Sequence, residues 1–176
     1  EDFDLDWSQD FPKDQFLINS EIFKTPEVEL EGYDDLSFEK KIEMDRHRVS
    51  WNLSQFLHGE QGALLVAARL VEAVPAIDAK YYGATQVVDE ARHVEAFSRY
   101  LDEKMPVTYP INENLRSLLN EVLRDSRWDV VFLGMQVVIE GLALAAFGFM
   151  MGTTRDPLLK EMLRYVMADE ARHVAF

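Results

Sequence analysis

The sequence predicts an all-α protein, and three observations lead to that fold class. Only 8 of the 176 residues are Gly and only 6 are Pro. Apolar residues recur with the helical period along most of the chain, and no segment keeps the alternation expected of a strand. The hexapeptide Asp-Glu-Ala-Arg-His-Val stands at residues 89–94 and again at 169–174, an offset of 80 residues. This repeat predicts a helical hairpin that occurs twice.

The first half of the chain divides into an arm and two long helices. Residues 1–36 are acidic, with aromatic residues scattered among Pro and Gly and no lasting period, so we expect an arm that packs over the domain. Ser37 is the expected N-cap of a helix over 38–74 that Pro75 ends. Further helices are expected over 77–104 and 113–124.

The second half predicts two more helices. Ser126-Arg-Trp-Asp129 resembles a capping box at the start of a helix that runs to Met151, with Gly152 as its C-terminal glycine. Asp156 and Pro157 are typical N-cap and first residues of the last helix. That helix continues to the end of the chain. We therefore expect the bundle domain, residues 37–176, to be cut within its last helix, as an excerpt of a longer protein.

The segment 130–151 is apolar and long enough to span a bilayer. A Glu at position 140 would penalise membrane insertion, and the flanks lack a basic asymmetry. A helix that is apolar all round is also typical of the centre of a bundle. We favour the buried core helix.

Charge and composition exclude several functions. Lys plus Arg is 18 and Asp plus Glu is 32, which gives a formal charge of −14 and argues against nucleic-acid binding and against docking on an anionic membrane. The absence of Cys excludes disulfides, thiolate metal sites and cysteine nucleophiles, and it fits a reducing compartment. The start of the chain lacks the basic and apolar regions of a signal peptide. We expect a cytoplasmic protein.

The offset of 80 also relates two acids, Glu60 and Glu140, and each stands 30 residues before the Glu of its hexapeptide. A helix rises about 1.5 Å per residue, so 15 residues up to the turn near Pro75 and 15 residues down place Glu60 and Glu90 at the same height. Within each Glu-x-x-His the two side chains share one helix face. The spacing therefore predicts convergence of four carboxylates and two imidazoles, all on apolar faces: Glu60, Glu90, His93, Glu140, Glu170 and His173.

Such a buried set predicts a site for two metal ions. Unpaired buried carboxylates cost several kcal/mol each, and two divalent cations would balance the four charges. Oxygen-rich ligands with one imidazole per metal suit Fe or Mn. A single Glu-x-x-His is usually a solvated pair, but two identical copies, each with an upstream Glu, favour metal binding.

These residues resemble the ferritin-like superfamily, and within it the ribonucleotide-reductase-like branch, which holds di-iron oxygenases, desaturases and p-aminobenzoate N-oxygenases. The resemblance covers about residues 50–176. It implies a ferritin-like four-helix bundle of two duplicated hairpins that holds two Fe ions, with Mn/Fe as an alternative. It further implies that Asp89 orients His173 and that Asp169 orients His93, with Arg92 and Arg172 holding the two aspartates.

The resemblance also has departures. The N-oxygenases carry an extra His ligand where this chain has Val166, which counts against N-oxygenation. Ribonucleotide reductase subunits carry a radical Tyr near the first Glu-x-x-His, whereas Tyr81 and Tyr82 stand about two turns before Glu90. We expect no radical Tyr here.

The resemblance implies an O2-activating non-haem di-iron oxidoreductase of the oxygenase or hydroxylase type that acts on an apolar or aromatic substrate. Its partners would be O2, a small organic substrate and an electron donor such as a ferredoxin or flavoprotein reductase, and a homodimer is allowed. The alternatives are a ferroxidase or iron-storage protein and a bundle whose repeat is only structural. Small residues beside the ligands either leave room for a substrate or allow close helix packing: Gly62, Ala63, Gly141, Ala143, Ala145, Ala146 and Gly148.

Overall fold

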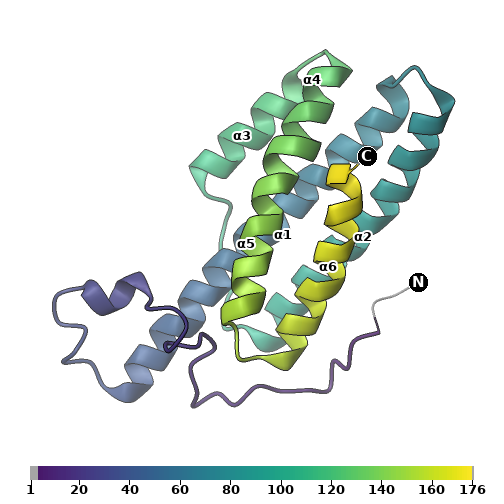
Figure 1. The fold of residues 1–176 in the computed structure, drawn as a ribbon. Helices are drawn as coiled ribbons and strands as arrows, with labels where there is room; N and C mark the ends of the chain where they lie inside the picture. Colours follow the sequence, from purple (N-terminus) through teal and green to yellow (C-terminus); the bar gives the residue numbers. More distant parts are fainter. Residues whose placement is uncertain (1–3, 176) are drawn as a thin grey trace.

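The computed structural model describes residues 4–175, and the long regular elements in that range are all helical (Figure 1). They are α1 (Phe38–Ala73), α2 (Ile77–Lys104), α3 (Glu113–Arg124), α4 (Trp128–Phe132), a π-helical segment (Leu133–Ile139), α5 (Glu140–Thr153) and α6 (Pro157–Ala175), after a short 3-10 turn at Pro26–Glu29. The described residues contain no strand beyond one isolated bridge between Ile18 and Thr154. The all-α prediction is confirmed.

Local sequence signals account for most of the helix ends. The Ser37 side chain accepts a hydrogen bond from the Lys40 backbone N–H at 3.3 Å, so the predicted cap of α1 is confirmed. Asp156 caps α6 in the same way, since its Oδ1 accepts from the Leu158 N–H at 2.9 Å. The predicted bounds of α2 and α3 also agree with the structure.

Two predicted helix ends are wrong, and tertiary contacts explain one of them. The helix expected from Ser126 begins at Trp128, without a side-chain cap, because Asp125 instead accepts the Arg127 backbone N–H at 2.9 Å. Gly152 lies inside α5, which continues to Thr153. The Thr153 carbonyl there accepts a hydrogen bond from the arm at 2.8 Å, so the arm helps to set the end of the helix.

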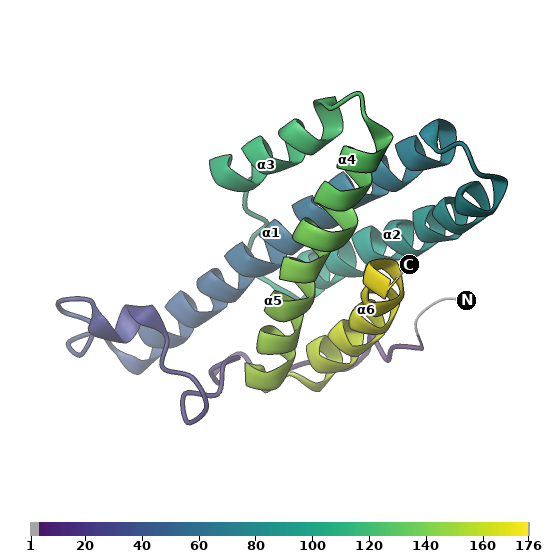
Figure 2. The same cartoon turned by 45° about the horizontal axis from the view of Figure 1, so that its top comes forward.

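The helices form two hairpins that pack side by side. α1 runs along α2, and the rod formed by α4, the π-helical segment and α5 returns along α6 (Figure 1). Figure 2 shows α3 lying across the outside of this group. The arrangement is compatible with a four-helix bundle. Two apolar clusters fill it, one around Leu53, Phe97 and Leu159 and one around Val66 and Met135, and the predicted ligand positions fall between them along the helices.

The apolar rod α4–α5 is not buried all round, contrary to the expectation for a core helix. Its inner face carries Met135 and Phe147, which are at most 1% exposed. Its outer face exposes Leu133, Val137, Val138, Leu142 and Phe149 by half or more. By length and composition alone, Trp128–Thr153 would also be able to cross a membrane, and one third of its most apolar window is buried.

The arm crosses one end of the helices and is tied to both hairpins. Leu17 and Ile18 are buried, and the buried Asp45 carboxylate of α1 accepts the Leu17 N–H at 2.6 Å. The Arg155 N–H, in the turn before α6, donates to the Leu17 carbonyl at 2.7 Å. The arm therefore joins the start of α1 to the turn between α5 and α6.

Candidate metal centre

The six predicted ligand residues come together inside the helices. Glu60 is on α1, Glu90 and His93 are on α2, Glu140 begins α5, and Glu170 and His173 are on α6. Each is at most 4% exposed. They form two groups whose ligand atoms lie within 4.8 Å of one another: Glu60, Glu90, His93 and Glu170 in the first, and Glu90, Glu140, Glu170 and His173 in the second. These buried groups could each hold a metal ion.

The two histidines face this cluster through the same ring nitrogen. His93 Nδ1 lies 3.2 Å from Glu60 Oε2 and 3.0 Å from Glu170 Oε1. His173 Nδ1 lies 3.4 Å from Glu90 Oε1 and 3.3 Å from Glu170 Oε2. Since both Nδ1 atoms point at carboxylates, both Nε2 atoms are left to contact groups outside the cluster.

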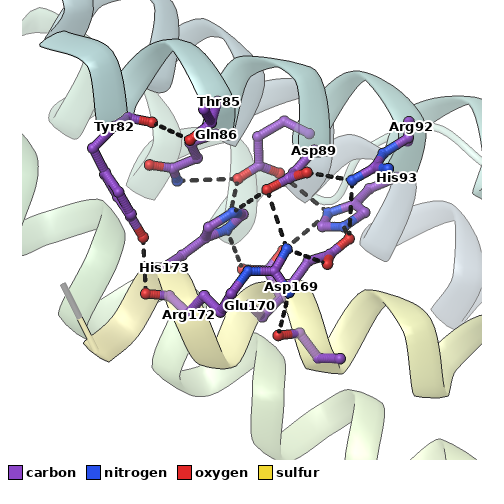
Figure 3. Close-up of polar contacts among 12 residues, drawn as sticks. Tyr82, Thr85, Gln86, Asp89, Arg92, His93, Asp169, Glu170, Arg172 and His173 are labelled. Atoms are coloured by element: carbon purple, nitrogen blue, oxygen red, sulfur yellow. Dashed lines mark hydrogen bonds and ion pairs between the residues drawn. The ribbon is translucent and has the colours of Figure 1, made fainter. Parts of the chain in front are cut away.

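The Nε2 atoms contact two aspartates, and the contacts cross between the halves (Figure 3). His93 Nε2 donates to Asp169 Oδ2 at 3.2 Å, and His173 Nε2 donates to Asp89 Oδ2 at 3.3 Å. These are the two pairings that the family resemblance implies. An Nε2–H held by a carboxylate leaves Nδ1 as the nitrogen with a lone pair in the neutral ring, which is the form that a metal ion needs.

Two arginines pair with the two aspartates that hold the histidine rings. Arg172 pairs with Asp169 at 2.5 Å and reaches Asp89 at 3.5 Å. Arg92 pairs with Asp89 and reaches Asp169 at 3.5 Å. Each arginine thus contacts the aspartates of both halves, and the charges of the two Asp–Arg pairs cancel outside the cluster.

Two carboxylate oxygens in the cluster have no well-aligned hydrogen bond among the described residues, and both lie within 3.4 Å of the single nitrogen His93 Nδ1. They are Glu90 Oε2 and Glu170 Oε1, both buried. Glu90 and Glu170 are also the two residues shared by both ligand groups. Unsatisfied buried oxygens are rare and costly. A cation held by these carboxylates would satisfy them, so the residues present fit a metal site.

The acid–base properties of the metal-free cluster support this fit. Burial raises the pKa of Glu60 well above its usual range, and burial with the charges of Glu170 and Glu90 raises the pKa of Glu140 to about 10. Burial alone would lower the pKa of His93, but hydrogen bonds with Asp169 and Glu170 outweigh it and raise the pKa. Without metal, the cluster therefore keeps protons that cations would displace.

Two buried residues beside the cluster escaped the sequence analysis. Gln86 Nε2 donates to Glu90 Oε1 at 3.1 Å and to Glu140 Oε1 at 2.9 Å, and Gln136 donates to Gln86 Oε1 at 2.7 Å. Each stands four residues before a ligand Glu, so helical spacing was the available signal. Gln136 lies in the π-helical segment that ends directly before Glu140, and such segments frequently occur at functional sites.

An apolar cavity of about 250 Å³ borders the cluster. Three of the carboxylates, Glu60, Glu140 and Glu170, form one wall. The remaining walls come from α1, α3, the π-helical segment and α5, and include Phe56, Leu115, Leu118, Ile139, Leu142, Ala143, Ala146 and Phe147. A larger cavity of about 430 Å³ lies between the arm and the start of α1 and contains none of the six clustered residues.

Some of the small residues near the ligands line the cavity, and others allow close helix packing. Ala63, Ala143 and Ala146 line the cavity. Gly62 instead allows α3 to approach α1, because a Cβ there would lie 2.6 Å from Leu119 Cδ2. A Cβ at Gly148 would lie 3.3 Å from Met167 Cε, which also indicates close packing.

The other two histidines, and the tyrosines at positions 81 and 82, lie outside the ligand groups. His47 Nδ1 contacts the Tyr109 hydroxyl at 2.7 Å, and His58 Nε2 contacts the Tyr109 carbonyl at 3.0 Å. Neither histidine joins a ligand group. Tyr81 is 65% exposed, and the Tyr82 hydroxyl donates to the Arg172 carbonyl at 2.8 Å (Figure 3).

Comparison of the chain with known protein families, with curated proteins and with solved structures gives no significant match.

Proposed function

We propose that this chain is a ferritin-like four-helix bundle that holds two iron ions and acts as an O2-activating oxidoreductase on a small apolar or aromatic substrate. The observation that carries the proposal is the pair of buried ligand groups that share Glu90 and Glu170. An apolar cavity borders three carboxylates of these groups, Glu60, Glu140 and Glu170. Neither feature is needed by a bundle whose repeat is only structural.

In this proposal Glu60 and His93 would hold one ion, Glu140 and His173 would hold the other, and Glu90 and Glu170, which belong to both groups, would serve both. Three carboxylate oxygens and one imidazole nitrogen in each ligand group favour iron or manganese over zinc. When bound, a pair of iron ions supplies the redox chemistry: O2 takes two electrons from the substrate and two from an external donor such as a ferredoxin or flavoprotein reductase.

The chain's own residues supply geometry and exclusion of water. Asp169 and Asp89 hold the rings of His93 and His173 through Nε2, which fixes the direction of both Nδ1 lone pairs. Phe56 and Phe147 give the cavity hydrocarbon walls directly beside the carboxylates. At about 250 Å³ the cavity lies just below the range of about 300–1,000 Å³ typical of drug-sized ligands, so it favours a small substrate.

Metal stoichiometry tests the ligand set. The metal-free chain, loaded anaerobically with Fe(II), should bind two ions, and Glu140→Ala should lose tight binding of at least one. Glu72→Ala is the matched control, because Glu72 is an exposed residue of the same charge on α1. An unchanged stoichiometry in Glu140→Ala would disprove the ligand set.

Assembly and turnover separate an oxygenase from a ferroxidase. An oxygenase of this kind should remain a monomer or small oligomer and should oxidise its bound iron once unless a donor and substrate are supplied. A cage of many subunits that oxidises successive additions of Fe(II) would contradict the proposed oxygenase and favour iron storage.

A further inference from the structure

Two buried amides lie at one end of the ligand cluster. Gln86 and Gln136 are at most 2% exposed, and they contact each other as well as the carboxylates. Gln86 Nε2 bridges Glu90 and Glu140 with distances of 3.1 and 2.9 Å. In the alternative orientation of the Gln136 amide, its nitrogen donates to Glu140 Oε2 at 2.5 Å and its oxygen accepts from Gln86 Nε2 at 2.7 Å, in place of the donation to Gln86 Oε1. In Figure 3 the Gln86 side chain extends from α2 toward the cluster.

The internal repeat shows that these amides break its symmetry. Shifted by 80 residues, Gln86 corresponds to Val166 and Gln136 corresponds to Phe56. Val166 is fully buried in the apolar core, and Phe56 lines the cavity. Equivalent positions in the two halves thus carry amides at one end of the cluster and hydrocarbon at the other.

A buried amide pair needs an explanation of its own. Burying an amide is unfavourable unless its donors and acceptors are paired, and a pair of apolar residues of the same shape would cost less. Val166 and Phe56 demonstrate that this fold accepts apolar residues at such positions. The contacts that the amides make are with the ligand carboxylates, which points to a role at the metal centre.

The amides contact the two ligand groups unequally. Glu140 belongs only to the second group, and Gln86 holds it directly. Glu60 belongs only to the first group, and its hydrogen-bond partner is His93 Nδ1, at 3.2 Å. A carboxylate held by a fixed donor loses less freedom when it binds an ion.

We propose that Gln86 and Gln136 are positioning residues that make the two metal positions inequivalent, with the Glu140–His173 position organised in advance through the Gln86 contact with Glu140, and the Glu60 carboxylate held by neither amide. This inference rests on the proposed metal centre. It goes beyond the ligand set because the repeat alone would give two equivalent positions.

The test is a stepwise titration of the metal-free chain with Co(II) in the absence of O2. Binding is measured by calorimetry and by visible absorption. Two Co(II) ions should bind in two separable steps with different absorption. The variant Gln86→Leu/Gln136→Leu removes both amides at once, so neither is left without its partner. In this variant the Co(II) affinity of one binding step should fall by about 10–100-fold, and its absorption should change. The other step should keep its affinity and its absorption. Glu60→Ala should remove the step that the amides do not affect.

Controls separate positioning from a general loss of packing. Val166→Ala perturbs the equivalent position in the other half and should leave the absorption of both steps unchanged. If the double variant does not fold, Gln136→Leu keeps the Gln86 contacts and should show a smaller loss in the same step. Equal effects on both steps, or none in either, would overturn this inference alone. Failure of the unaltered chain to bind Co(II) would overturn the proposed metal centre together with it.

Discussion

Gly62 sets how closely α3 can approach α1, and replacing it by Ala tests that contact quantitatively. A Cβ at this position would lie 2.6 Å from Leu119 Cδ2 and 2.9 Å from Cδ1, well inside the distance of about 3.5–4.0 Å that is optimal for carbon atoms. Overpacking of this kind costs about 1–3 kcal/mol. Against this cost, a Gly-to-Ala change inside a helix raises the free energy of unfolding by about 1 kcal/mol, because Ala has the higher helix propensity. The net expectation is a loss of up to about 2 kcal/mol in the free energy of unfolding.

Gly59 provides the matched control on the same helix. A Cβ there would meet nothing within 4 Å, so Gly59→Ala should stabilise the chain by about 1 kcal/mol. The two variants should therefore differ by about 1–3 kcal/mol in urea unfolding. Combining Gly62→Ala with Leu119→Ala should relieve the clash and give a favourable coupling energy. Equal stability of the two glycine variants, or no coupling with Leu119, would refute the reasoning.

Three further predictions follow from the described contacts. Asp169→Asn should weaken metal binding by about 10–100-fold, measured by competition with a chelator, because it alters the group that orients His93; unchanged affinity would contradict that role. Asp45→Ala should destabilise the chain by at least about 1–3 kcal/mol and expose the arm to proteolysis, because it leaves buried backbone N–H groups unpaired; wild-type resistance would argue against this anchor. The metal-free chain should lose stability as the pH rises from 6 to 9, because the folded state keeps a proton on Glu140, whose pKa is raised to about 10, while the unfolded state does not. The raised pKa of His93 acts in the same direction. Glu140→Gln should reduce the dependence of the unfolding free energy on pH, measured by denaturant unfolding. A stability that increases from pH 6 to 9 would contradict a protonated Glu140 in the folded state.

The parts of the fold that could be predicted are those that local chemistry determines. Ser37 and Asp156 cap their helices through hydrogen bonds within three residues, and such contacts can be read from the sequence. The end of α5 depends on a contact with the arm, which is distant in the sequence. The outer face of α5 was expected to be buried because hydrophobicity shows that a helix is apolar but not how many neighbours it has.

The convergence of the six ligand residues followed from the repeat, because equal spacing about a turn brings residues to the same height. The amides were missed for a physical reason. A Gln four residues before a Glu is a common pair on solvated helices, and only the packing shows that Gln86 and Gln136 are buried. The sequence left a cavity beside the ligands as one of two alternatives, because it does not show that α3 supplies a wall from outside the repeated hairpins.

The two ligand groups have a consequence for how the molecule can be divided. Each takes three residues from one half of the chain and one from the other, Glu170 in the first and Glu90 in the second. Each histidine is also oriented by the aspartate of the opposite half. A single hairpin is therefore an incomplete unit that lacks one carboxylate and one orienting group. A second hairpin supplies both, whether it is joined through the chain or present as a separate fragment, so complementation of two fragments would rebuild the whole centre.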